Sequence, residues 1–128
     1  MPPTGRCSLR STRCGGLRGP AMWICLNDSF LSIVDKGDPT HATLLVRARR
    51  AGDIERVFPE AEVSTKGGSD YAYRARLPRE RVASRIAEAV RGIGYGNFKA
   101  TVREPRRHDV YMEVWAALAR DQDGAQGR

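Results

Sequence analysis

Two short stretches of the sequence share a pattern of arginines that suits phosphate binding. Arg47-Ala48-Arg49 and Arg74-Ala75-Arg76 each carry two arginines separated by one small residue. Alternate residues of a β-strand share a face, so each stretch places both guanidiniums on one side of its strand. A guanidinium donates hydrogen bonds in a planar fork that fits phosphate oxygens. We therefore predict a polyanion-binding surface of Arg47, Arg49, Arg74 and Arg76, which Arg50, Lys66 and Arg79 would extend.

A second group of basic residues surrounds Pro105, at the start of a predicted helix. Basic side chains at a helix N-terminus interact unfavourably with the helix dipole. One alternative is therefore that these residues bind an anion. The same segment contains Glu104 and Asp109, whose charges offset part of the cluster. We therefore expect a solvated turn here, with a secondary basic cluster. Its members are Arg103, Arg106, Arg107 and His108.

Signatures of catalysis and of metal binding are sparse. His41 falls in a predicted loop and His108 near a helix start, and neither has a serine or cysteine at a recognisable spacing. Arginine, tyrosine and histidine on a sheet are nevertheless the residue types that small metal-independent ribonucleases use. The acidic residues lack the spacing of a cation-binding loop, and the glycine-rich segments lack the context of a nucleotide-binding loop. We expect no catalytic residue, no metal site and no cofactor.

Hydrophobic alternation predicts the strands that carry the arginine pairs. Two apolar runs near the start are separated by Asn27-Asp28, residues that tolerate the positive φ of a primed hairpin turn. A second hairpin turns at Lys66–Ser69. On the strand that carries Arg47, the residues Leu44, Val46 and Ala48 share the opposite face. The predicted strands are 22–26, 29–34, 43–50, 62–65 and 71–77.

Helical spacing and helix-boundary residues predict the remaining elements. Gly52-Asp53 offers an N-cap for a short helix that Pro59 ends, and Pro78 precedes a longer helix. An apolar stripe at helical spacing along that longer helix is formed by Val82, Ile86, Val90 and Ile93. A short helix is expected between Phe98 and Val102. The last helix, 106–120, is expected to bury Val110 or Tyr111 together with Val114, Trp115 and Leu118.

The aromatic residues are predicted to lie in the core and not on the arginine-bearing surface. Alternation places Tyr71 and Tyr73 on the face opposite Arg74 and Arg76. The other residues assigned to the core are Phe30, Phe58, Phe98 and Trp115. Stacking of nucleic-acid bases is therefore not expected from this pattern, and phosphate contacts alone are blind to sequence.

The order of predicted elements, ββ-β-α-ββ-α-α, is typical of an α+β two-layer sandwich. We expect an antiparallel sheet of about five strands with helices on one face, and its middle section has the βαββα order of a ferredoxin-like unit. Residues 22–120 form a single domain in this interpretation. Residues 121–128 are expected to be a frayed tail.

Charge and composition narrow the functional classes. The 128 residues carry a net charge of +7, of which the arginine-rich and acid-free residues 1–21 contribute +4, so residues 22–128 carry only +3. That value is ordinary for a folded domain, so the overall charge overstates the argument for a polyanion partner. No apolar run approaches the roughly 20 residues of a membrane-spanning helix. We expect no membrane partner.

Residues 1–21 differ in composition from the rest of the chain. They lack the apolar segment of a secretory signal peptide, so we expect either a disordered arm or an over-extended N-terminus, with Met22 as the start. The odd count of cysteines, Cys7, Cys14 and Cys25, without a CxxC spacing, predicts neither a disulfide framework nor a zinc site. Cys25 is expected to be a small buried residue, and a cytoplasmic location is expected.

A resemblance covers residues 22 to about 118. The run Trp23–Val34 and the closing Tyr111–Trp115 resemble segments of a group of short, uncharacterised bacterial proteins. The resemblance implies no activity. It supports Met22 as the start of the domain.

Three functional hypotheses follow. The first is a non-enzymatic binding module whose basic sheet face contacts nucleic acid or another polyanion. The second is a protein-interaction or inhibitor module, encoded on a mobile element, that uses the same face against an acidic protein. Homodimerisation through the edge of the first hairpin is a version of the second hypothesis. The third is a metal-independent ribonuclease that depends on His41 or His108.

Overall fold

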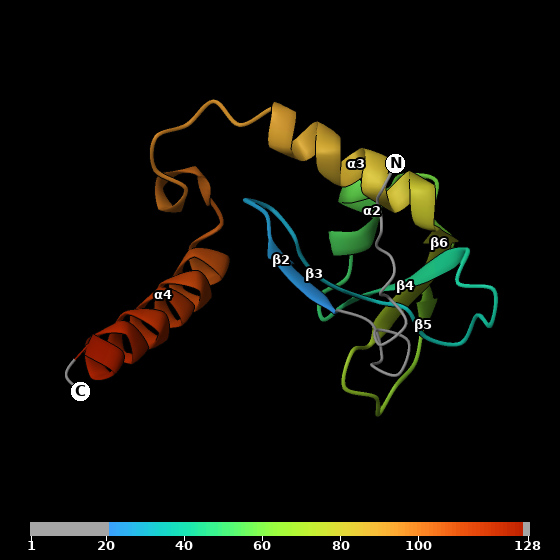
Figure 1. Cartoon of the computed structure of the whole chain (residues 1–128), viewed down its shortest axis with the longest axis horizontal. Coiled ribbons are helices and arrows are strands. Elements are labelled where there is room, and N and C mark those ends of the chain that lie inside the picture. The colour runs from blue at the N-terminus through green and yellow to red at the C-terminus, as the bar shows by residue number, and fades with distance from the viewer. Residues whose placement is uncertain (1–20, 127–128) are drawn as a thin grey trace, which may run out of the picture.

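The structure, a computed structural model, describes residues 21–126, and the predictions for residues 1–20 and 127–128 lie outside that range. Its strands are β2 (Met22–Cys25), β3 (Phe30–Val34), β4 (Thr43–Ala48), β5 (Ser64–Thr65) and β6 (Tyr73–Pro78). Its helices are α2 (Asp53–Val57), α3 (Arg79–Arg91) and α4 (Pro105–Gln126), with a 3-10 turn η1 (Lys99–Thr101) between the last two. The predicted α+β class with an antiparallel five-stranded sheet is confirmed (Figure 1).

The strands are ordered β2-β3-β4-β6-β5, and every neighbouring pair is antiparallel. β6 thus lies between β4 and β5, the two strands that α2 connects. This is the split arrangement expected of a βαββα unit. The hairpin of β2 and β3 extends the sheet on the other side of β4.

One face of the sheet carries the core, and α2 and α3 cover it (Figure 1). Alternation along β3, β4 and β6 directs one set of apolar side chains to this face, as predicted. Phe58 follows α2 and is fully buried, and Val82 is the buried residue of α3. The core cluster consists of Leu31, Ile33, Val46, Ala48, Ile54, Val57, Phe58, Ala75, Leu77 and Val82.

The first hairpin forms at the predicted place, but its turn has a different geometry. Residues 26–29 connect the strands with Asn27 and Asp28 at the turn, and the Leu26 amide donates to the Ser29 carbonyl at 2.8 Å. Among the residues of the described range other than glycine, only His41 has a positive φ. The turn is therefore not of the primed type, and the prediction of positive φ at Asn27-Asp28 is wrong.

α3 begins directly after Pro78 and ends at Gly92, as predicted. The fixed φ of proline is compatible with the N-cap position, which Pro78 occupies. Gly92 is the C-cap residue, at which the helix ends. Val82 is buried and Ile86 packs against the core, whereas Val90 and Ile93 are exposed. The predicted apolar stripe is therefore covered only in its first half.

α4 departs from the prediction in position and in length. It lies beyond the β2–β3 end of the sheet instead of on the helical layer (Figure 1), so the expectation of all helices on one face holds for α2 and α3 only. The helix continues to Gln126, through residues that were assigned to a frayed tail. Val110, Val114, Trp115 and Leu118 are exposed, and the prediction that this stripe is buried is correct only for Tyr111.

Candidate functional site: the second face of the sheet

The face of the sheet opposite the core carries all four arginines of the predicted site. Strand pairing aligns Trp23 with Ser32, Ser32 with Arg47, Arg47 with Arg74, and Arg74 with Ser64. These five residues form one row across the whole sheet. Arg76 lies in the next row, opposite Leu45, and Arg49 follows Arg47 past the end of β4. We call this surface, with Trp23, Arg47, Arg49, Arg74 and Arg76, the arginine face.

Three of these arginines have no carboxylate partner among residues 21–126. Arg47 donates from Nη2 to the Ser32 hydroxyl at 2.8 Å, and its buried Nε has no hydrogen-bond acceptor. Arg74 donates from Nε to the Tyr71 carbonyl at 3.4 Å. Arg76 donates to the Lys36 carbonyl at 2.9 Å and to the Thr43 hydroxyl at 3.2 Å. Neutral acceptors hold these side chains in place without cancelling their charge, which leaves it available to an anion.

The buried side chain of Tyr71 contacts two arginines of the arginine face. The residue is 3 % exposed, and the guanidinium carbons of Arg47 and Arg49 lie 4.5 and 4.2 Å from its ring centroid. The prediction that Tyr71 shares the core face of Tyr73 is therefore wrong. β6 begins only at Tyr73, and the irregular residues before it break the alternation on which that prediction rested. The ring fixes two arginines through cation–π contacts.

Trp23 is the functional candidate that sequence reasoning missed. Its side chain is 72 % exposed on the edge strand β2, and its ring makes an edge-on contact with Phe30 at 6.0 Å. Phe30 is thus half-buried on the arginine face and not in the core, and Trp115 is exposed on α4, so both core assignments are wrong. Cys25, on the same edge strand, is exposed and not buried as expected. Alternation along β2 places the side chains of Trp23 and Ile24 on different faces of the sheet. Only the register of β2, β3 and β4 places Trp23 in one row with Arg47.

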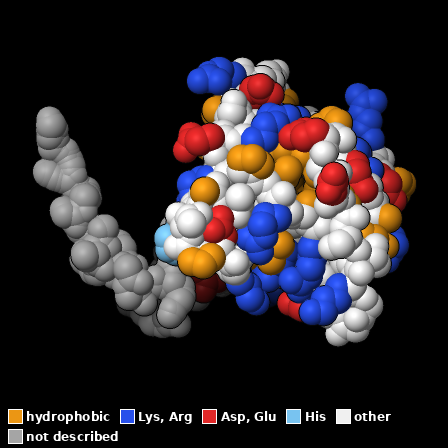
Figure 2. All heavy atoms as spheres, turned by 90° about the vertical axis from the view of Figure 1, so that its right-hand side faces the viewer, with side chains coloured by type: hydrophobic (Ala, Val, Ile, Leu, Met, Phe, Trp, Pro, Cys, Tyr) orange, Lys and Arg blue, Asp and Glu red, His pale blue; other side chains and the backbone are white. Residues whose placement is uncertain are grey.

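Arg49 of the predicted site and two of the residues expected to extend it, Arg50 and Arg79, form ion pairs, whereas Lys66 forms none within residues 21–126. Arg49 forms an ion pair with Asp70 at 3.2 Å, and Arg50 pairs with Glu104 at 2.9 Å. Arg79 binds Asp35 at 2.7 Å, so its charge is already compensated. On the right-hand side of the molecule in Figure 1, Asp and Glu side chains lie among Lys and Arg side chains in the upper half, and Lys and Arg predominate in the lower half (Figure 2). The ion pairs of Arg49, Arg50 and Arg79 therefore weaken the expected extension of the site.

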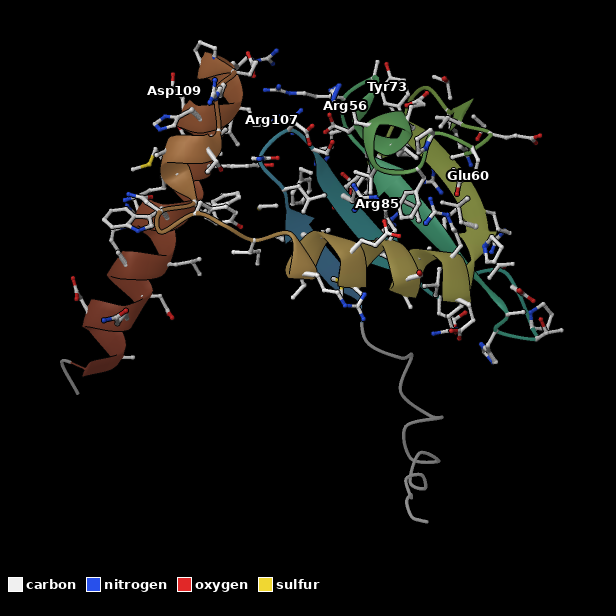
Figure 3. The ribbon with its side chains drawn as sticks, turned by 90° about the horizontal axis from the view of Figure 1, so that it is seen from above. Arg56, Glu60, Tyr73, Arg85, Arg107 and Asp109 are labelled. Carbon is white, nitrogen blue, oxygen red and sulfur yellow. The ribbon has the colours of Figure 1, made fainter. Side chains whose placement is uncertain are left out.

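Arg107 of the secondary basic cluster is buried and paired within the domain. Arg107 is 4 % exposed and makes two hydrogen bonds to the Asp53 carboxylate, at 2.7 and 3.1 Å. The same carboxylate accepts from the Phe30 amide at 3.0 Å and from Arg56 at 2.9 Å. Arg107 extends from α4 toward α2 in Figure 3. The expectation of a solvated turn is therefore wrong for Arg107, which is a buried structural residue.

Glu104 neutralises the start of α4. Its carboxylate accepts hydrogen bonds from the backbone amides of Arg106 and Arg107, at 3.2 and 2.7 Å, and from Arg50. These bonds, that of Arg50 first, hold the pKa of the Glu104 carboxyl below its ordinary value. A carboxylate that caps the helix in this way occupies the position in which an external anion would bind.

A groove of about 600 Å³ lies beside this cap, between the first hairpin turn and the start of α4. Arginines are prominent in its lining, but Arg50, Arg56 and Arg107 each pair with a carboxylate. Arg103 is the lining arginine without such a partner within residues 21–126. The groove is therefore a structural junction, and the arginine face remains the stronger candidate. The lining residues are Asn27, Asp28, Arg50, Ala51, Arg56, Thr101, Arg103, Glu104 and Arg107.

The two histidines are not brought together. His41 lies in the loop between β3 and β4, with its Nδ1 atom 2.8 Å from Asp35, and has a left-handed φ of 62°. His108 lies in the first turn of α4, and α4 lies beyond the other end of the sheet from the loop between β3 and β4 (Figure 1). In the described part of the chain no three potential metal ligands gather in one place, and no helix is long and apolar enough to cross a bilayer.

Comparisons of the chain with models of protein families, with curated proteins and with solved structures found no match.

Proposed function

We propose that this protein binds single-stranded nucleic acid on the arginine face of its sheet. The observation that carries the proposal is the row in which Arg47 and Arg74 lie next to each other, with exposed Trp23 at its end. Arg76 adds a third guanidinium without a carboxylate partner among the described residues. No helix of the described range packs on this face, since α2 and α3 cover the other one.

Phosphates and bases would be bound by different ends of the row. Neighbouring strands are about 4.8 Å apart, so Trp23 lies roughly 10 Å, or two strand spacings, from Arg47. A strand of nucleic acid crossing the sheet would place phosphate oxygens on the guanidiniums and a base against the indole. Stacking on an exposed aromatic ring requires a base that is not paired in a duplex, which favours a single-stranded ligand.

The alternative partner is an acidic protein that binds the same arginines. This alternative accounts for the unpaired guanidiniums but gives Trp23 no particular role. It therefore predicts binding of an acidic peptide, such as polyglutamate, at least as tight as that of an oligonucleotide of similar charge. The proposal predicts the reverse order.

The test is a fluorescence-anisotropy titration of the full chain with labelled single-stranded and double-stranded oligonucleotides and with polyglutamate. Neutralising three or four phosphates should lower the affinity for a single strand roughly 20- to 50-fold between about 50 and 200 mM salt. The variant Arg74→Glu/Arg76→Glu should bind at least about tenfold more weakly, because it removes two phosphate contacts and adds repulsion.

The matched control is Arg91→Glu/Arg103→Glu, which changes the net charge equally at exposed positions away from the sheet. Its affinity should stay within about threefold of the unmodified chain. Equal losses in the two variants would show that only total charge matters and would contradict the site. Affinity that does not change with salt would contradict phosphate binding altogether.

A further inference from the structure

α4 presents an apolar surface that its own domain does not cover. Arg107 and Tyr111 are the buried residues of the helix between Pro105 and Ala125, and both lie in its first two turns. Arg107 binds Asp53 of α2, and Tyr111 donates from its hydroxyl to the first hairpin turn, at 2.9 Å from the Leu26 carbonyl and 3.0 Å from the Ser29 carbonyl. Beyond these contacts the helix extends away from the sheet (Figures 1 and 3).

The uncovered part of α4 carries a continuous stripe. Val110, Val114 and Leu118 recur every four residues and therefore lie along one line of the helix, spanning about 12 Å. Leu118 is 65 % exposed and Trp115, beside this line, is 53 % exposed. A helix of this kind gains most of its stability by packing its apolar stripe against another element. Contiguous exposed apolar residues of this kind are typical of an interface.

The stripe is continued by aromatic contacts at the base of the helix. Phe98 stacks on the Tyr111 ring with 5.9 Å between centroids, and Tyr95 contacts Phe98 at 6.1 Å. Lys99 lies 4.6 Å from the ring centroid of Trp115. These contacts attach the N-terminal part of α4 to its own domain. The apolar stripe farther along the helix remains exposed.

We propose that two copies of this chain associate through antiparallel pairing of their α4 helices. The charges beside the stripe support this partner. Glu113 and Arg120 are seven residues apart, so they lie on the same flank of the helix two turns from each other. Antiparallel pairing centred between Ala116 and Ala117 places Glu113 of each helix opposite Arg120 of the other, which forms the ion pair twice.

The same register brings two of the exposed apolar residues together, whereas Val114 lies opposite Ala119 and Val110 lies opposite Asp123. Trp115 of one helix lies opposite Leu118 of the other, and the small side chain of Ala117 at the centre permits close approach of the backbones. The centre lies about 17 Å along the helix from Pro105, which leaves room for both domains. Parallel pairing in register would instead place this flank of the two helices on opposite sides of the interface, so the ion pair between Glu113 and Arg120 would not form.

The interface is small, because the stripe offers few residues compared with the roughly 20–30 residues per side of a standard protein–protein interface. Association is therefore expected to depend on concentration, with a Kd in the micromolar range. The test is sedimentation equilibrium of the full chain across that range, with a reductant present to exclude disulfides between copies. The expected result is a reversible monomer–dimer equilibrium.

Charge exchange tests the register. Glu113→Arg should raise the Kd of the dimer at least about tenfold, because it places arginine opposite arginine at both ends. Adding Arg120→Glu to that variant should return the Kd to within about threefold of the unmodified chain. A double variant that stays as weak as the single one would overturn the antiparallel register.

Leu118→Glu tests the surface itself. This side chain is exposed in the monomer, so the substitution should abolish association without lowering the unfolding temperature. Val90→Glu is the control, since Val90 is an equally exposed residue of α3 outside the stripe. A chain that stays monomeric at all concentrations, or a dimer that tolerates Leu118→Glu, would overturn the proposal.

Discussion

Arg107 and Asp53, far apart in the sequence, form a buried ion pair with two hydrogen bonds that joins α4 to α2. Two further donors, the Phe30 amide and Arg56, bind the same carboxylate. The pair therefore connects the last helix, the short helix and the first hairpin at one point. Beyond this pair and the contacts of Tyr111, α4 extends away from the sheet (Figure 1).

Loss of Arg107 is expected to destabilise the protein strongly. Arg107→Ala leaves the Asp53 carboxylate buried without its main partner, which costs about 3–5 kcal/mol in comparable buried pairs. Urea unfolding followed by circular dichroism measures the change. Arg106→Ala is the control, because Arg106 is exposed on the same turn and its loss should cost less than about 0.5 kcal/mol. Similar unfolding free energies for the two variants would contradict the structural role of the pair.

The cap at Glu104 predicts a specific dependence on pH. The pKa of Glu104 is lower in the folded chain than its ordinary value of 4.5, so its contribution to stability is fully present above that value. The contribution is lost as the pH falls through the lowered pKa, when protonation removes the bonds from Arg50 and the helix amides. The difference in unfolding free energy between the unmodified chain and Glu104→Gln should therefore shrink below about pH 4.5.

Urea unfolding at a series of pH values checks this prediction. Glu88→Gln serves as the control, because Glu88 is an exposed glutamate of α3 that caps no helix. A difference for Glu104→Gln that is constant over the acidic range would mean that protonation of this carboxyl does not affect the cap.

Trp23→Ala is expected to weaken binding of single-stranded nucleic acid without affecting the fold. Stacking of one base on an aromatic side chain contributes about 1–3 kcal/mol, which corresponds to roughly 5- to 150-fold in Kd. Trp115→Ala removes the same side chain from α4 and should leave this Kd unchanged at protein concentrations below the dimer Kd. The two variants also separate the two proposals, since only Trp115→Ala should weaken self-association. Equal affinities of Trp23→Ala and the unmodified chain would eliminate stacking at this position.

Gly52→Ala is expected to disturb the position of Asp53. Gly52 precedes α2 with a φ of 92°, a conformation that alanine adopts only with strain, and an added Cβ would lie 3.0 Å from the Arg56 guanidinium. We expect a loss of about 1–2 kcal/mol in unfolding free energy. Gly67→Ala is a matched control, because no atom lies within 4 Å of an added Cβ there. An effect of the same size at both positions would show that the backbone conformation of Gly52 is not the cause.

Local patterns were sufficient to predict much of the fold. The alternation of Leu44, Val46 and Ala48 identified the core face of β4, and Pro78 and Gly92 marked the ends of α3. The same alternation placed the four arginines on one face, since a period of two residues depends only on the strand itself. The failures lie where the backbone is irregular, as at Tyr71, or where apolar side chains of a helix stay exposed in the folded chain, as at Val90 and Leu118.

Local sequence patterns therefore predict the α+β class, the approximate bounds of most elements, and the shared face of Arg47, Arg49, Arg74 and Arg76. Three features are seen only in the folded chain: Trp23 joins the row of Arg47 and Arg74, Arg107 is a buried partner of Asp53, and the outer part of α4 is uncovered. The sequence separation of the interacting residues explains this difference. Secondary structure and sidedness follow from neighbours within a few residues, whereas strand register and burial depend on pairings between residues that are far apart in the chain.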